Sequence, residues 1–246
     1  MKRQGRAFFA EIVAGIVAVV AALCGNLLWA AVWAVFAVGA AIAARVWSRT
    51  DPGPMPYFMR WLLFTPRGPH SPQHLKRILQ PRPGERILEV GPGVGIHAIP
   101  VAFSLLPNGI LDVLDVQQEM LDELKRRAAK AGVTNIVSAQ GDAQKLPYPD
   151  RIFDAAYLIG VLGEVPDGAA ALGELRRVLK PAGRLIIGEV FVDPDYISLP
   201  TLKEKARDVG FIFVEKAGPG IVYLAVFRAP VAAELESAGR AVLKWR

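Results

Sequence analysis

The sequence has a single cysteine, Cys24, among its 246 residues. One thiol excludes an internal disulfide framework and a zinc site built from cysteines. Because Cys24 lies inside a long apolar run, a thiol nucleophile in the more polar remainder of the chain is excluded as well. This scarcity is typical of a protein that works in a reducing cytoplasm.

The body of the chain lacks an excess of positive charge, although the net charge of the whole chain is +6. Residues 1–82 contain ten Lys and Arg against Glu11 and Asp51, so residues 83–246 carry a net charge of −2. The basic residues flank the apolar run and do not form the stripe across a folded domain that nucleic-acid binding requires. We therefore predict a bilayer with anionic headgroups as the partner, and no nucleic acid.

The N-terminal region lacks charge over 33 consecutive residues, from Ile12 to Ala44, and Asn26 is its only strongly polar residue. A single upright helix of that length would reach about 50 Å, beyond a hydrocarbon core about 30 Å thick. The pair Gly25-Asn26 is a suitable turn near the middle. We expect residues 1–50 to form a transmembrane helical hairpin with arms at 8–24 and 27–44, whose basic ends stay cytoplasmic.

Two alternatives to the hairpin stay open. One long tilted helix would also accommodate the run. A secretory signal peptide is disfavoured because its apolar region is usually about 7–15 residues long.

The segment that follows, residues 51–82, is rich in proline and carries aromatic residues beside Arg60. We expect this juxtamembrane linker and helix either to lie in the headgroup layer or to pack on the domain that follows.

Strand-like and helix-like stretches alternate with short links from Glu85 onward. Strands are expected at 86–90, 110–114, 135–139, 153–159, 184–190, 211–216 and 221–227, and helices at 95–105, 117–131, 168–179 and 198–209. This alternation predicts an α/β fold, a Rossmann-like doubly wound sheet of seven mostly parallel strands. Only AGPG separates the last two strands, so the last one should run antiparallel. The domain is assigned to 83–229, and the tail 230–246 is expected to be a C-terminal helix.

A glycine-spaced turn follows the first of these strands, in the stretch ERILEVGPGVGI from Glu85 to Ile96. A Cβ at Gly91 or Gly93 would obstruct the approach of backbone N–H groups to a ligand. Twenty residues after Gly95, the stretch ILDVL ends in Asp115, whose carboxylate can hold ribose hydroxyls. The pattern predicts a binding site for an adenosine-bearing cofactor.

The glycine spacing bears on which cofactor this is. The spacing is GxGxG and not the GxGxxG of dinucleotide sites, and none of the five tyrosines is followed four residues later by lysine, as a short-chain dehydrogenase requires. The chain contains four motifs in a fixed order: LEVGPGVG, LDVLDVQQEML, GDAQKLPYPDRIFDAAY and LRRVLKPAGRLIIGE. With these motifs the chain resembles the class I S-adenosylmethionine-dependent methyltransferases. The likeness is strongest to the branch that includes ubiquinone/menaquinone and small-lipid methyltransferases, and it covers about Arg82–Phe227.

The resemblance implies roles for residues at the ends of the first four strands. Glu89 would organise the methionine end of S-adenosylmethionine, above a turn formed by Gly91, Gly93 and Gly95. Asp115 would hold the ribose, and Val116 would lie beside the adenine. Asp142 would accept a hydrogen bond from the adenine amino group, with Ala143 near it, and Ile159 would line the pocket. Pro92 stands where the family more often has Cys, Gly or Ser. No metal is implied.

A general base is less well defined by the sequence. His97, two residues after Gly95, is the candidate catalytic residue, and its alternative is a partly buried helix residue with a hydrogen bond. His70, His74, Tyr57, Tyr157 and Glu164 are further pocket candidates.

Taken together, these observations predict a membrane-anchored methyltransferase with a cytoplasmic catalytic domain. It would transfer a methyl group from S-adenosylmethionine, with S-adenosylhomocysteine as product, to a lipophilic acceptor such as a lipid headgroup, a quinone or an isoprenoid-type molecule. Two alternatives stay open: a membrane-tethered module that binds the cofactor without catalysis, and a nucleotide-dependent oxidoreductase.

Overall fold

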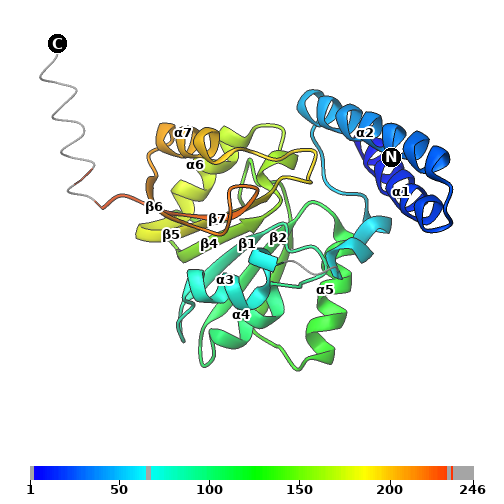
Figure 1. Cartoon of the computed structure of the whole chain (residues 1–246). Coiled ribbons are helices and arrows are strands. Elements are labelled where there is room, and N and C mark those ends of the chain that lie inside the picture. Colours follow the sequence, from blue (N-terminus) through cyan, green and yellow to red (C-terminus); the bar gives the residue numbers. More distant parts are fainter. Residues whose placement is uncertain (1–2, 65–67, 232–233, 235–246) are drawn as a thin grey trace, which may run out of the picture.

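The computed structural model describes residues 3–64, 68–231 and 234. An N-terminal helical hairpin stands beside an α/β domain (Figure 1). The C-terminal helix expected at 230–246 lies almost wholly outside the described residues.

The hairpin consists of α1 (Arg3–Leu23) and α2 (Leu27–Thr50), which pack along each other. The chain reverses at Gly25, whose φ of +76° suits glycine. The side chain of Asn26 then accepts a hydrogen bond from the Trp29 N–H and caps α2. Gly25-Asn26 thus ends one helix and begins the next.

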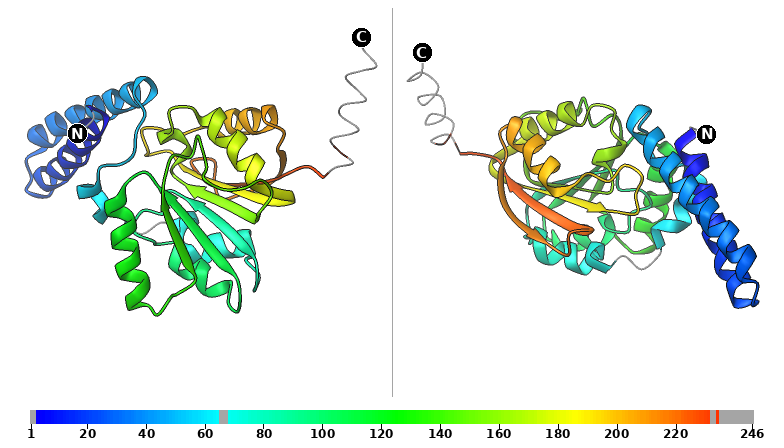
Figure 2. Two further views of the ribbon diagram at one scale, coloured as in Figure 1. Left: turned by 180° about the vertical axis from the view of Figure 1, so that it is seen from behind. Right: turned by 45° about the horizontal axis from the view of Figure 1, so that its top comes forward.

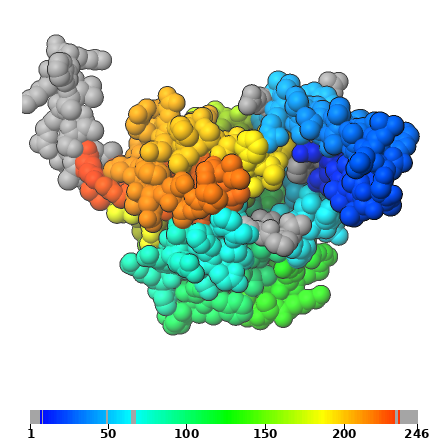
Figure 3. All heavy atoms as spheres, viewed as in Figure 1, coloured from blue at the N-terminus to red at the C-terminus, as the bar shows by residue number. Residues whose placement is uncertain are grey.

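Most of the surface of the hairpin is apolar and open, and Figure 3 shows it protruding from the α/β domain. Leu23, Leu27 and Val35 are 82%, 75% and 74% exposed. The segment Leu27–Ser48 is long and apolar enough to cross a membrane, with a mean hydropathy of 2.2 over 22 residues, whereas Phe9–Leu23 is apolar but shorter. Exposed apolar area on this scale is unfavourable in water and favourable in lipid.

The α/β domain contains a seven-stranded sheet with the order β3-β2-β1-β4-β5-β7-β6. The strands are β1 (Arg86–Val90), β2 (Ile110–Asp115), β3 (Ile136–Gln140), β4 (Phe153–Ile159), β5 (Leu179–Val190), β6 (Ile212–Ala217) and β7 (Val222–Arg228). All pairings are parallel except those of β7, which is antiparallel to β5 and β6. The predicted fold class and the antiparallel last strand are confirmed. β5 begins at Leu179, before the expected Arg184, because Leu179 already pairs with Phe153 of β4.

Helices cover both faces of the sheet, as Figure 2 shows. They are α3 (Pro72–Leu79), α4 (Ala98–Ser104), α5 (Gln118–Lys130), α6 (Gly168–Val178) and α7 (Leu199–Asp208), with short 3-10 segments η1 (Tyr57–Phe64), η2 (Gly68–His70) and η3 (Leu162–Glu164). One apolar core lies between the sheet and α6 and α7, and the other lies between the sheet and α3, α4 and α5.

The strand order reverses next to β1, which lies between β2 and β4. Parallel sheets of this kind bind ligands beyond the carboxyl ends of the strands at such a reversal. The registers align these ends, because Val90 pairs with Leu114, and Asp115 pairs with Gln140. The fold therefore places the turns after β1, β2 and β3 side by side, next to the turn after β4.

Candidate active site

The turn after β1 is built on glycine. Gly91, Gly93 and Gly95 have φ values of +68°, +51° and +82°, a region that residues with a Cβ rarely adopt. The Gly91 N–H donates to the carbonyl of Leu114 over 2.8 Å, which ties the turn to β2. A Cβ on Gly91 would lie 2.4 Å from the side chain of Val161, which follows β4. Conformation and packing therefore both require glycine at position 91.

Asp115, at the end of β2, faces this turn. Its Oδ1 accepts from the Gln117 N–H over 2.9 Å, and its side chain is buried. Burial raises the pKa of Asp115, against the lowering effect of the backbone N–H groups of Gln117, Gly93 and Val116. The structure thus brings the predicted carboxylate to the predicted turn. Val116 lies next to Asp115 and is half-exposed, so its side chain is open to a ligand.

Glu89 is a buried carboxylate in β1, opposite Tyr157 of β4. The Tyr157 hydroxyl donates to Glu89 Oε2 over 2.7 Å. Burial, followed by the charge of Glu89, raises the pKa of Tyr157 well above its usual value, so the phenol stays protonated and holds Glu89 in place. Ile159, at the end of β4, packs toward β5, since its Cδ1 lies 2.7 Å from where a Cβ of Gly188 would be.

The turn after β3 contains Asp142 and Ala143. Asp142 is exposed, and its Oδ1 accepts from the Gln144 N–H over 2.9 Å, while Ala143 is buried. The turn adjoins Asp115, because the Gly141 N–H donates to the Asp115 carbonyl over 3.0 Å. Asp142 therefore stabilises its own turn, at the edge of the site where the resemblance places the adenine.

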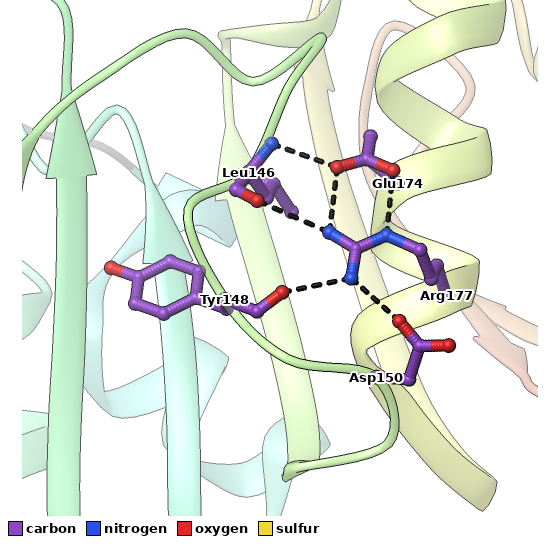
Figure 4. A network of polar contacts seen from close by, with 5 residues as sticks. All are labelled: Leu146, Tyr148, Asp150, Glu174 and Arg177. Atoms are coloured by element: carbon purple, nitrogen blue, oxygen red, sulfur yellow. Dashed lines mark hydrogen bonds and ion pairs between the residues drawn. The ribbon is translucent and has the colours of Figure 1, made fainter.

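Arg177 of α6 holds the chain that follows Asp142 (Figure 4). Its guanidinium donates to both oxygens of Glu174, to Asp150, and to the carbonyls of Leu146 and Tyr148, over distances of 2.7–3.1 Å. Glu174 in turn accepts from the Leu146 N–H over 2.8 Å. A planar group with several fixed donors is needed to reach all these acceptors.

Replacing Arg177 with lysine is expected to destabilise this loop, because an ammonium cannot span the acceptors. We expect the free energy of unfolding to fall by about 1–2 kcal/mol, with a smaller loss of cofactor affinity. Chemical denaturation and calorimetry with S-adenosylhomocysteine measure the two effects. Arg176→Lys, on the same helix but outside this network, is the control, and equal effects of the two substitutions would contradict the assignment.

His97 is the N-cap residue immediately before α4, and it is buried. Its Nε2 lies 2.7 Å from the carbonyl oxygen of His70, and Nε2 must carry a proton to donate there. The Nε2 of His70 lies 3.0 Å from the Tyr223 carbonyl. These contacts link α4 to η2 and β7. They favour the interpretation of His97 as a buried histidine with a hydrogen bond over that of a general base. We assign no base role to His97.

Residues 51–64 cross the site as a strap between the hairpin and the domain. The Met55 carbonyl accepts from Gln117 Nε2 over 2.8 Å, and the Met55 N–H donates to Glu164 Oε1 over 3.3 Å. Leu63 Cδ1 lies 2.9 Å from where a Cβ of Gly93 would be. The strap therefore contacts the turns after β1, β2 and β4. Of the two arrangements expected for residues 51–82, these contacts agree with packing on the α/β domain.

The base of the hairpin contacts the loop that follows β5. The Arg45 guanidinium donates to the Phe191 carbonyl and lies 4.9 Å from the centre of the Phe191 ring. The Ser48 hydroxyl donates to the Pro194 carbonyl over 2.9 Å. Phe191 and Val192 are themselves more than half exposed. The same loop therefore touches the hairpin and borders the carboxyl ends of β4 and β5.

Comparisons with known proteins agree with this geometry. Residues 88–187 match the family described as "Methyltransferase domain". The 27-O-demethylrifamycin SV methyltransferase of Amycolatopsis mediterranei is 33% identical over 139 residues, which are 55% of this chain and 50% of that protein. A ubiquinone/menaquinone biosynthesis C-methyltransferase of Pseudomonas putida is 37% identical over 141 residues, 56% of this chain and 52% of that protein. The chain thus spans about half the length of these curated relatives.

Solved structures show the same fold. An S-adenosylmethionine-dependent methyltransferase from Aquifex aeolicus superposes with a TM-score of 0.65 at 20% identity, over 71% of this chain and 98% of that one. A protein from Bacillus subtilis superposes with a TM-score of 0.55 at 22% identity, over 61% of this chain and 70% of that one.

Proposed function

We propose that this chain, whose residues 88–187 match a methyltransferase domain, is a class I S-adenosylmethionine-dependent methyltransferase that methylates a lipophilic acceptor resident in the membrane. The observation that carries the proposal is the contact between the open, apolar hairpin and the loop bordering the site.

The turn after β1 and Asp115 fit S-adenosylmethionine. Gly91 and Gly93 give the turn the positive φ angles that its conformation needs, and the buried Asp115 carboxylate can accept from two ribose hydroxyls. Glu89 would serve the methionine end, and Val116, Asp142 and Ala143 would flank the adenine. The bound cofactor supplies a methyl group already activated on a sulfonium. The protein has to hold the acceptor in line with that methyl and keep water out.

The hairpin supports a membrane location. Its outer apolar side chains have no cover in the described chain, and the basic residues of positions 1–82 lie on either side of the apolar run. We propose that the hairpin is embedded in the bilayer and that the α/β domain stays in the cytoplasm with its site at the membrane surface. A relative named for ubiquinone/menaquinone biosynthesis agrees with a lipophilic acceptor.

Incubation of the purified full chain with methyl-labelled S-adenosylmethionine and a membrane lipid extract tests this function. We expect label in the lipid fraction, where mass spectrometry identifies the product. Calorimetry should show binding of S-adenosylhomocysteine and none of NADH. Cofactor binding without transfer of label would favour the non-catalytic module, and binding of NADH alone would favour the oxidoreductase.

A further inference from the structure

Four carboxylates gather at the carboxyl ends of β4 and β5, beyond the residues assigned to the cofactor. Glu164 ends η3, Glu189 lies near the end of β5, and Asp193 and Asp195 lie in the loop that follows. Ile159 pairs with Gly188, so Glu189 lies opposite the turn after β4. The loop packs directly on that turn, because Asp193 Oδ2 lies 3.2 Å from where a Cβ of Gly160 would be.

Glu189 is the most buried of the four, at 2% exposure. Its Oε2 accepts from the Ile197 N–H over 3.1 Å, but its Oε1 is buried without a hydrogen-bond partner. Leaving a buried carboxylate oxygen unpaired is costly. Burial, together with the charges of Asp193 and Asp195 and against the lowering effect of the Ile197 N–H, raises the pKa of Glu189 to about 8. The Glu189 carboxylate therefore favours a hydrogen-bond donor or a positive charge beside it.

Glu164 lies between this loop and the cofactor residues. Its Oε1 accepts from the Met55 N–H of the strap. Burial, then the charges of Asp195 and Asp193, raise its pKa well above the usual value, and Asp115 acts in the same direction. The charged groups that shift Glu164 are thus all acidic. A cation that entered here would relieve their repulsion.

We propose that Glu164, Glu189, Asp193 and Asp195 form the acceptor subsite, and that the acceptor is a lipid whose headgroup ends in an amine. This inference rests on the proposed methyltransferase function. In the described part of the chain these side chains are not arranged as a metal-binding group. Arg45, on the hairpin side of Phe191, supplies a positive charge beside the loop. A headgroup with a phosphate near the bilayer and an amine at its end would place the phosphate near Arg45 and the amine near the four carboxylates.

The chemistry needs one proton acceptor. The ammonium of the headgroup gives a proton to the Glu164 carboxylate, which the approaching positive charge has ionised. The free amine attacks the methyl carbon, so that the N–C bond forms as the S–C bond breaks and S-adenosylhomocysteine is left. The methylated nitrogen is then an ammonium, and Glu164 returns its proton to water. A carboxylate whose pKa is raised above that of an exposed glutamate is a stronger base and is better suited to this transfer.

Vesicles test the acceptor class with the full chain. Phosphatidylcholine vesicles contain either phosphatidylethanolamine, phosphatidylglycerol or a long-chain hydroquinone, and a fourth sample contains only soluble phosphoethanolamine. We expect label on the nitrogen of phosphatidylethanolamine and at least about tenfold less in the other samples. Label mainly on the glycerol headgroup, the hydroquinone or soluble phosphoethanolamine overturns the inference but leaves methyl transfer standing. Binding of S-adenosylhomocysteine without label on any acceptor contradicts the proposed function itself.

Glu164→Gln tests the role of the base, because the amide oxygen can still accept from Met55. We expect kcat on phosphatidylethanolamine to fall about 100-fold with little change in KM, and the pH dependence of kcat to lose the limb due to Glu164. Glu189→Gln should instead raise KM about tenfold. Calorimetry with S-adenosylhomocysteine reports whether either variant has lost its fold.

Glu204→Gln, at an exposed position of α7, is the matched control and should leave both constants unchanged. If the Glu164→Gln variant keeps wild-type kcat, or if all three substitutions have equal effects, the assignment of the subsite is wrong.

Discussion

Replacing Asp115 with alanine is expected to weaken binding of S-adenosylhomocysteine by about 100- to 10,000-fold. The carboxylate would accept from two ribose hydroxyls, and hydrogen bonds to a charged group contribute about 1.5–3 kcal/mol each, with about 1.4 kcal/mol per factor of ten. Isothermal titration calorimetry measures the change directly. Asp122→Asn, at an exposed position of α5, is the control and should bind normally.

The stability of the Asp115 variant separates lost binding from lost folding. Burial raises the pKa of Asp115, so the ionised side chain is disfavoured in the ligand-free fold. Its removal should therefore leave the melting temperature of the ligand-free protein unchanged or higher, while it abolishes the rise caused by the ligand. Normal affinity, or a large drop in that melting temperature, would contradict the role given to Asp115.

The raised pKa of Asp115 also fixes the sign of the pH dependence. Only the ionised carboxylate can accept from both hydroxyls, and a raised pKa means that it takes up a proton at a higher pH than an exposed aspartate does. Affinity for S-adenosylhomocysteine should thus decline on acidification from a higher pH than an ordinary aspartate would predict. The Asp115→Ala variant should lack this dependence.

Deleting residues 1–50 is expected to lower turnover of bilayer substrate by about 100-fold, because the hairpin raises the effective concentration of the enzyme at the membrane. Affinity for S-adenosylhomocysteine should stay within about twofold, since the strap contacts of Met55 and Leu63 lie outside the deletion. Turnover of labelled lipid in vesicles is compared with turnover of a short-chain, water-soluble analogue. The vesicle assay should respond to the deletion much more strongly than the assay with the soluble analogue.

A point variant separates membrane attachment from support of the loop after β5. Ser48→Ala removes the hydrogen bond to the Pro194 carbonyl and keeps the hairpin. We expect this variant to stay on vesicles during flotation and to lose less activity there than the deletion. If the deletion keeps full turnover in vesicles, the membrane part of the proposal is wrong.

Much of the fold followed from local pattern. The alternation of strands and helices predicted the parallel sheet, and the short AGPG link predicted the antiparallel β7, because neither needs knowledge of distant contacts. The glycine turn and Asp115 were also visible in sequence, since their spacing reflects the length of one strand-helix-strand unit. Parallel strands that end at one edge then bring them together.

The carboxylates beyond the cofactor residues had no such signature. Glu164 was one unsupported candidate among several, and Glu189 reads as a polar residue ending an apolar strand. Their convergence depends on the pairing of β4 with β5 and on a loop that folds back over η3. His97 shows the converse, because its position near the glycine turn suggested chemistry, while its hydrogen bond to the carbonyl of His70 indicates a structural role.

Composition and spacing by themselves determined the class of fold, the cofactor turn and the apolar hairpin, because each is set by residues close together in the chain. Only the tertiary structure decided that the strap lies over the turns, that the hairpin base touches the loop after β5, and that four acids gather beyond the ends of β4 and β5. The Met55–Glu164 and Ser48–Pro194 contacts join residues more than a hundred positions apart, and they form only when the sheet has assembled.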